Sequence, residues 1–145
     1  MWYKNSIKKK VEIKMLIPAC YQSNGLASRW VALEMLGAIL VEKKMLSEIK
    51  ENKKFPLYNL LPEQRARSIS LLEGVLRNLP ALDSVISDYV DKKKTNLRII
   101  NILRLAAAEI ILDKIAIHAA VDSAVRLTKL DKKIARLSGL VNAVC

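Results

Sequence analysis

The stretch LRIINILRLAAAEIIL, residues 97–112, decides the fold class of this protein. Drawn as a helix, it is hydrophobic on most of its circumference, and such a helix is usually the buried centre of a helical bundle. Asn96, directly before it, is a residue type that caps helix N-termini well. Its sparse polar positions are Arg98, Asn101, Arg104 and Glu109. We therefore expect a central helix that begins after Asn96 and that other helices surround.

Helical periodicity also marks the segments before this stretch. From Leu26 to about Lys43, hydrophobic residues recur at three- and four-residue steps, which predicts a helix with one buried stripe. A short helical turn is expected over residues 45–49. Pro62 and Pro80 each open a further helix, in positions where a missing N–H costs little. The residues expected to be buried on these three long helices are Leu26, Trp30, Leu33, Leu36, Leu40 and Val41; Ala66, Ile69, Leu72, Leu76 and Leu79; and Leu82, Val85, Ile86, Tyr89 and Val90.

Two more helices are expected after the central one. A break near residues 113–117 leads into a sixth helix that ends near Leu130, and a seventh runs from about Lys132 to the C-terminus. No strand pattern competes anywhere, and the chain has only 4 Gly and 4 Pro. The prediction is an all-α fold, a single bundle of about six to seven helices over residues 23–145, preceded by a basic extension over residues 1–22.

The charge of the chain points to an anionic partner. Its 25 Lys and Arg residues against 14 Asp and Glu residues give a net charge of +11. Such a surplus attracts polyanions and gives salt-dependent affinity for phosphate backbones. It does not identify the polyanion, because a composition rich in Lys and Ile also arises from an AT-rich genome.

The sequence contains no recognisable catalytic or metal-binding motif. The glycines are isolated, and no spacing of Cys and His fits a metal site, so we expect no cofactor and no metal. His118 is the only histidine, and we interpret it as a structural residue in the first turn of a helix. Cys20 and Cys145 lie in terminal segments and read as reduced thiols of a cytoplasmic protein. Charges interrupt every long hydrophobic run, so no membrane span is expected.

Several segments, taken in order, resemble the NusB-like domain family. They are ASRWVALEML (27–36), LLEGVLRNLPALDSVI (71–86), ILRLAAAEIIL (102–112), IHAAVDSAVRLTK (117–129) and GLVNAV (139–144). The HAAVD and GLVNAV versions are most similar to the N-terminal NusB-like domain of the bacterial small-subunit rRNA cytosine methyltransferase RsmB. The resemblance to the transcription antitermination factor NusB is weaker.

This resemblance implies an all-helical RNA-binding domain made of two small subbundles. In the methyltransferase, the catalytic cysteine lies in a domain that binds S-adenosylmethionine and would follow Cys145, so we expect no methylation by this chain alone. Two alternatives stay open. One is a free-standing antitermination factor, and the other is a protein–protein module that docks on a ribosomal protein or on a separate methyltransferase domain.

The resemblance also nominates RNA-binding residues. Arg29 matches the family's arginine near the start of the first helix, and Lys8, Lys9 and Lys10 lie upstream of it. Arg65 begins the third helix together with Arg67, and we include Arg65 among the RNA-binding candidates. The alternatives are a solvated Arg29 at a helix N-terminus and a lysine run that only solubilises the extension. Trp30 lies on the hydrophobic stripe and is assigned to the core rather than to base stacking.

Overall fold

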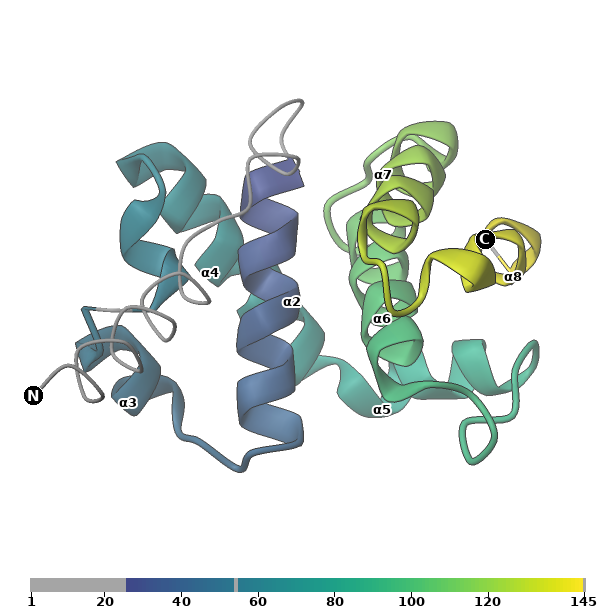
Figure 1. Cartoon of the computed structure of the whole chain (residues 1–145), viewed down its shortest axis with the longest axis horizontal. Coiled ribbons are helices and arrows are strands. Elements are labelled where there is room, and N and C mark those ends of the chain that lie inside the picture. The colour runs from purple at the N-terminus through teal and green to yellow at the C-terminus, as the bar shows by residue number, and fades with distance from the viewer. Residues whose placement is uncertain (1–25, 54, 145) are drawn as a thin grey trace, which may run out of the picture.

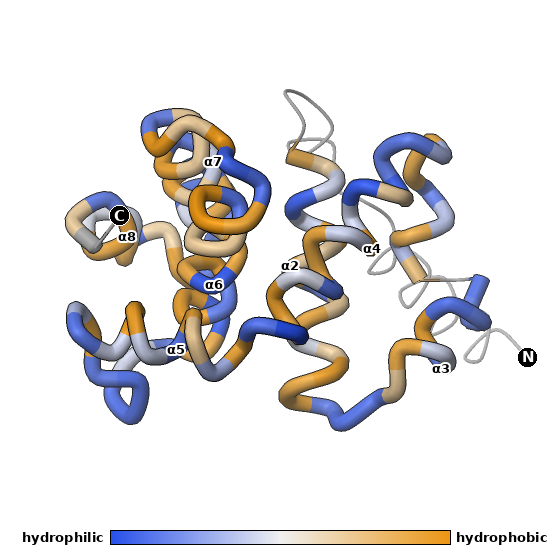
Figure 2. Tube along the Cα trace, turned by 180° about the vertical axis from the view of Figure 1, so that it is seen from behind, coloured by the Kyte–Doolittle hydropathy of each residue, from blue (hydrophilic) through white to orange (hydrophobic). Residues whose placement is uncertain are grey.

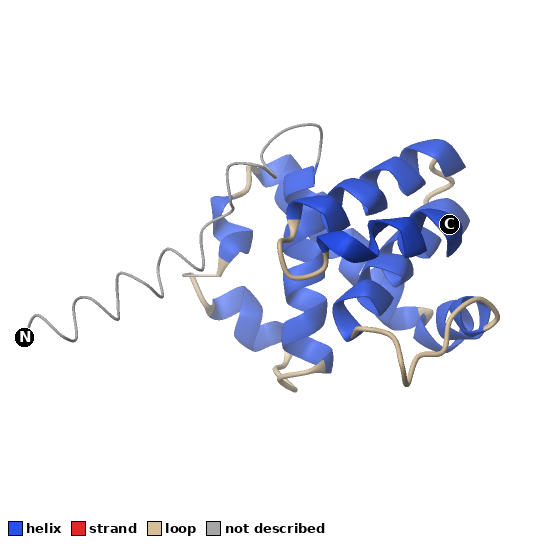
Figure 3. Cartoon of the chain, turned by 45° about the vertical axis from the view of Figure 1, so that its right-hand side comes forward, coloured by secondary structure: helices blue, strands red, loops and turns tan. Residues whose placement is uncertain are grey.

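The computed structural model describes residues 26–53 and 55–144, and every regular element in these ranges is helical (Figures 1 and 3). The predicted all-α fold is therefore confirmed. The elements are the α-helices α2 (Leu26–Leu40), α3 (Leu46–Glu51), α4 (Pro62–Arg77), α5 (Leu79–Ser87), α6 (Leu97–Ile111), α7 (Ile117–Leu130) and α8 (Ser138–Val144), with the 3-10 turns η2 (Pro56–Asn59) and η3 (Ala135–Leu137).

The helices form two groups that meet along α2 and α6. α3 and α4 lie with α2, whereas α5, α7 and α8 lie with α6 (Figure 1). Arg29 near the start of α2 pairs with Glu109 near the end of α6. Glu34, further along α2, pairs with Arg98 at the start of α6. The two helices therefore run antiparallel, and ion pairs close both ends of their contact.

The central role expected of α6 is confirmed. Asn96 caps the helix, because its side-chain oxygen accepts the N–H of Arg98 at 2.8 Å. The residues from Ile99 to Ala106 are all buried, and the polar side chains among them have hydrogen-bond partners. Figure 2 shows that the connection between α5 and α6, unlike α6 itself, is largely hydrophilic. Burial of a nearly continuous hydrophobic surface is what holds this helix at the centre.

The expectation of a single buried stripe on α2 is wrong. Nearly the whole helix is buried, including the polar Ser28 and Arg29, because α4, α6 and α7 all pack against it. Trp30 lies in the core as predicted, with 6% of its surface exposed. α2 also ends earlier than expected, at Leu40, because the backbone turns into the left-handed region at Lys43 (φ 60°).

The buried face of α4 is also rotated from the predicted one. Ala66 is exposed, and Ile69 and Leu76 lie only at the edge of the core. The buried positions are Ser68, Leu71, Leu72 and Val75. Ser68 is buried although it is polar, because its hydroxyl donates to the backbone oxygen of Ser28 at 3.0 Å. This hydrogen bond attaches the N-terminal half of α4 to the first turn of α2.

The C-terminal segment is less regular than predicted. The expected helix from Lys132 is replaced by a turn, the 3-10 turn η3 and then α8. The carboxylate of Asp131 accepts the backbone N–H of Lys133 at 3.0 Å, and the Asp131 backbone oxygen accepts that of Ile134 at 3.1 Å. These bonds fold residues 131–134 as a turn, so α8 begins only at Ser138.

An ion cluster around Asp83 holds α5 against α6. Arg104 donates from Nε and Nη2 to the two carboxylate oxygens of Asp83 at 2.7 and 2.9 Å, and Lys92 Nζ lies 2.9 Å from one of them. Burial by itself would raise the pKa of Asp83, but the hydrogen bonds and charges of Arg104 and Lys92 outweigh it and lower the pKa below its ordinary value of 3.8.

The Asp83 cluster predicts a pH-dependent stability difference. A carboxylate with a lowered folded-state pKa stabilises the fold above its unfolded pKa, and that contribution is lost as the pH falls through the folded value. Asp83→Asn should therefore lower the free energy of unfolding at about pH 6, and its deficit relative to wild type should shrink below about pH 4. Urea unfolding of both proteins across this range measures the difference. A deficit that does not change with pH would contradict the assignment.

Candidate nucleic-acid interface

Arg29 is not the solvated cation that one sequence interpretation allows. Only 9% of its side chain is exposed, and its Nε and Nη2 each donate to one carboxylate oxygen of Glu109 at 2.8 Å. Glu109 is still more buried, with 3% of its side chain exposed. A parallel two-bond geometry of this kind is the strongest arrangement for an arginine and a carboxylate. The assignment of Arg29 to RNA binding stays a prediction, and the structure gives Arg29 this interhelical contact.

Arg67 is the accessible cation next to this pair. Its Nη2 lies 3.8 Å from the second carboxylate oxygen of Glu109, and half of its side chain is exposed. Arg67 lies here because its neighbour on α4, Ser68, donates a hydrogen bond to the backbone oxygen of Ser28 on α2. The two arginines and one carboxylate leave an excess positive charge at the N-terminal end of α2. The candidate residues chosen from the sequence omit Arg67, although its place beside Arg65 could have identified it.

Arg65 is occupied within the protein. Its guanidinium donates to the backbone oxygens of Leu57 at 3.4 Å and Leu60 at 3.3 Å, and it lies 5.2 Å from the centre of the Tyr58 ring. These contacts attach the 3-10 turn η2 to α4, and the contact with Tyr58 is a cation–π interaction. The RNA-binding assignment of Arg65 remains a prediction. The remaining candidates, Lys8, Lys9 and Lys10, lie outside the described residues.

His118 and the carboxylates show no catalytic arrangement within the described residues. His118 is exposed in the first turn of α7. Within residues 26–53 and 55–144, no group of three His, Cys, Asp or Glu side chains could hold a metal ion. Glu34 is partly buried and accepts a hydrogen bond from Arg98 at 2.7 Å. No helix in the described part of the chain could cross a membrane.

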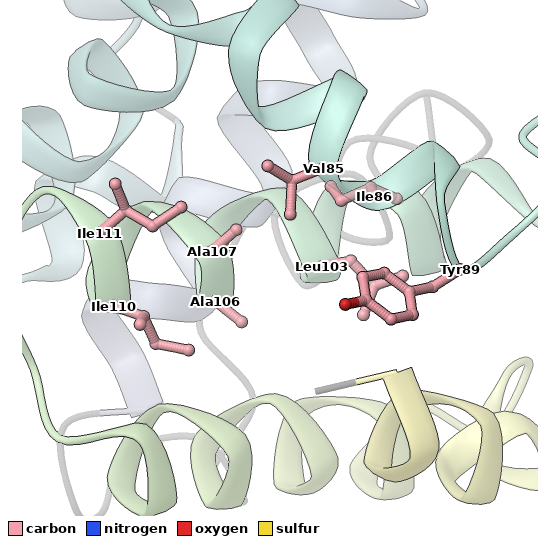
Figure 4. Close-up of a pocket in the computed structure, with 8 residues that line it drawn as sticks. All are labelled: Val85, Ile86, Tyr89, Leu103, Ala106, Ala107, Ile110 and Ile111. Carbon is pink, nitrogen blue, oxygen red and sulfur yellow. The ribbon is translucent and has the colours of Figure 1, made fainter.

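A hydrophobic hollow lies between α5 and α6. Figure 4 shows its lining, which comprises Val85, Ile86, Tyr89, Leu103, Ala106, Ala107, Ile110 and Ile111. The sequence predicts Val85 and Tyr89 to be buried, and that is wrong, because 45% and 67% of their surfaces are exposed. α5 spans only residues 79–87 and packs mainly on α6, so its outer side stays open. The lining offers hydrophobic contact and one hydroxyl group.

These features describe an all-helical domain in which a half-exposed arginine lies beside a buried ion pair at the start of α2. The family model of the NusB family matches residues 26–145, and the chain belongs to this family. No curated protein and no solved structure is similar enough to give a significant match. Membership in the family suggests a domain of the RNA-binding or antitermination type.

Because the Arg29–Glu109 pair is buried, we expect a single substitution to lower the free energy of unfolding much more than the double substitution does. Arg29→Met leaves Glu109 buried with only the more distant Arg67, and the free energy of unfolding should fall by about 3 kcal/mol. The double variant Arg29→Met, Glu109→Leu removes both charges and should return close to wild-type stability. Urea unfolding of the single and double variants measures this.

Arg126→Met is the matched control for that experiment. Arg126 also pairs with a carboxylate, Asp122, but on the exposed side of α7. Because water screens this pair, its loss should change stability by less than about 1 kcal/mol. Equal losses for Arg29→Met and Arg126→Met would show that the buried pair does not hold α2 against α6.

Proposed function

We propose that this chain is an RNA-binding domain that acts in the cytoplasm as the targeting domain of an rRNA small-subunit cytosine methyltransferase. The observation that carries the proposal is the half-exposed Arg67 beside the buried Arg29–Glu109 pair, in a NusB-family chain with a net charge of +11. Arginine suits this task because its planar guanidinium recognises phosphate with two parallel hydrogen bonds.

Each cation has a separate part in this proposal. Arg29 neutralises Glu109 and fixes its carboxylate, which leaves the charge of Arg67 available to phosphate. Lys8, Lys9 and Lys10 precede α2 in the sequence and add sequence-independent attraction. Arg65 supports the site by holding η2 in place, and its positive charge adds to the attraction for the RNA. The RNA is an rRNA segment or a nascent transcript.

The chain is proposed to bind RNA without modifying it. Methyl transfer to cytosine requires a nucleophile and a site for the methyl donor, which the resemblance assigns to a separate catalytic domain. A free-standing antitermination factor would use the same cationic site, so the choice between these two roles does not alter the RNA contacts.

Substituting Arg67 tests the proposal directly. Arg67→Gln should weaken binding to a single-stranded RNA several-fold, because one phosphate loses its cation. The dependence of the logarithm of affinity on the logarithm of salt concentration should become shallower by about 0.7. Fluorescence anisotropy with a labelled RNA over a salt series measures both quantities.

Arg77→Gln provides the matched control on the same helix. Arg77 lies in the last turn of α4, is more exposed than Arg67 and lies 3.7 Å from one carboxylate, that of Glu73. If only net charge mattered, both variants would lose the same affinity. Equal losses, or no binding by the wild type at low salt, would overturn the proposed site.

The hydrophobic hollow favours a second candidate function, docking on a protein. Val85 and Tyr89 expose hydrophobic surface beside Ile111, which is 52% exposed. A ribosomal protein or a separate methyltransferase domain is the partner that this candidate implies. After nuclease treatment, the wild type should still retain such a partner in a pull-down, whereas Tyr89→Lys should release it. Retention of the partner by both proteins would argue against the hollow as the docking surface.

A further inference from the structure

A second group of cations lies at the opposite end of the α2–α6 contact. Here the middle of α2, the start of α6 and the turn after α7 come together, because Arg98 joins all three. Its Nη2 donates to Glu34 on α2 at 2.7 Å, and its Nε donates to Asp131 after α7. Burial would lower the pKa of Arg98, but Glu34 and Asp131 together raise it above its ordinary range, so it stays charged.

Two carboxylates at this end bind Arg98, whereas a third, Glu42, is exposed and pairs with Lys44 at 3.1 Å. Glu34 and Asp131 both bind Arg98 and are partly buried. The lysines around them are exposed and make no ion pair with any residue that the structure describes. They are Lys129, Lys132 and Lys133, which we call the α7-end patch.

The position of the α7-end patch is not explained by helix electrostatics alone. Lys129 lies in the last turn of α7, where the helix dipole favours a cation. Lys132 and Lys133 lie beyond the helix, in the turn that Asp131 closes. That turn is anchored on both sides, by the bond from Arg98 to Asp131 and by the burial of Ile134, which is 1% exposed. The backbone is thus fixed while the ammonium groups face water.

We infer that the α7-end patch is a second contact surface for the phosphate backbone of the RNA bound at Arg67. The inference rests on the proposed RNA-binding function and extends it to the length of RNA that the domain engages. A fixed turn with two adjacent lysines lowers the entropic cost of placing cations along a phosphate backbone. Because neutralised phosphates release counterions, each lysine engaged adds to the affinity and to its salt dependence.

The separation of the two surfaces sets the size of this RNA. On α6, Arg98 and Glu109 lie 11 residues apart in the sequence, which corresponds to about 16 Å of helix. Arg67 lies beside Glu109, and the α7-end patch lies around Asp131, which Arg98 binds. At about 3.4 Å per stacked nucleotide, an RNA that reaches both surfaces needs at least about six nucleotides. A shorter RNA occupies only one of them.

The test compares two double variants of the full chain that each remove two lysine charges. Lys132→Gln, Lys133→Gln changes the patch, and Lys50→Gln, Lys53→Gln changes exposed lysines in and after α3. Anisotropy titrations with oligouridines of about 5 and about 20 nucleotides give the affinities and salt slopes. Urea unfolding checks that both variants fold.

The patch variant should lose about fivefold or more affinity for the long RNA, with a salt slope shallower by about 1.4, and less than about twofold for the short one. The Lys50, Lys53 variant should stay within about twofold of wild type for both RNAs. Equal losses for the two variants would overturn the inference, as would a patch variant that loses binding to anionic vesicles but not to RNA. If Arg67→Gln weakens RNA binding and the patch variant does not, only this inference falls. If the wild type binds neither RNA, the proposed function falls as well.

Discussion

The contact between Arg29 and Glu109 is the constraint on which the arrangement of this protein depends. Two opposite charges are removed from water at the meeting of α2 and α6, and such a pair is tolerated only when its geometry recovers the cost of desolvation. The two parallel hydrogen bonds at 2.8 Å provide that geometry. They also fix the register of α2 against α6, since a shift of either helix along the other would leave a buried charge without its partner.

Other carboxylates at helix contacts are also paired with arginines. Asp83 and Asp131 pair with the arginines of α6, so the carboxylates of the helix contacts are directed inward. Lys129, Lys132 and Lys133 lie at the end of α7 and in the turn after it, and they are exposed to water. On the proposed function, the exposed cations would attract phosphate without any dedicated pocket.

A function based on such a surface differs physically from one based on a catalytic centre. Phosphate contacts are additive and sensitive to salt, so no single side chain has to be held within a fraction of an ångström. The exposed hydrophobic hollow at α5 is separate from the cationic sites and fits contact with a protein instead. On the proposed function, the domain would use distinct surfaces for an RNA and for a protein partner, which suits a targeting role in the NusB family.

The sequence by itself determined the helical class, the approximate position of most helices and the central place of α6, because periodicity, prolines and the Asn96 cap are local signals. The family followed from the resemblance of several segments taken in order. Only the tertiary structure decided which arginine is buried and which is half exposed. Arg29 and Arg67 both lie near helix starts, and what separates them is Glu109, which lies 80 residues from Arg29 along the chain. The rotation of α4 that exposes Ala66 and buries Ser68 depends in the same way on a hydrogen bond to another helix. A contact of this kind arises from packing in three dimensions, and the local pattern of residues does not contain it.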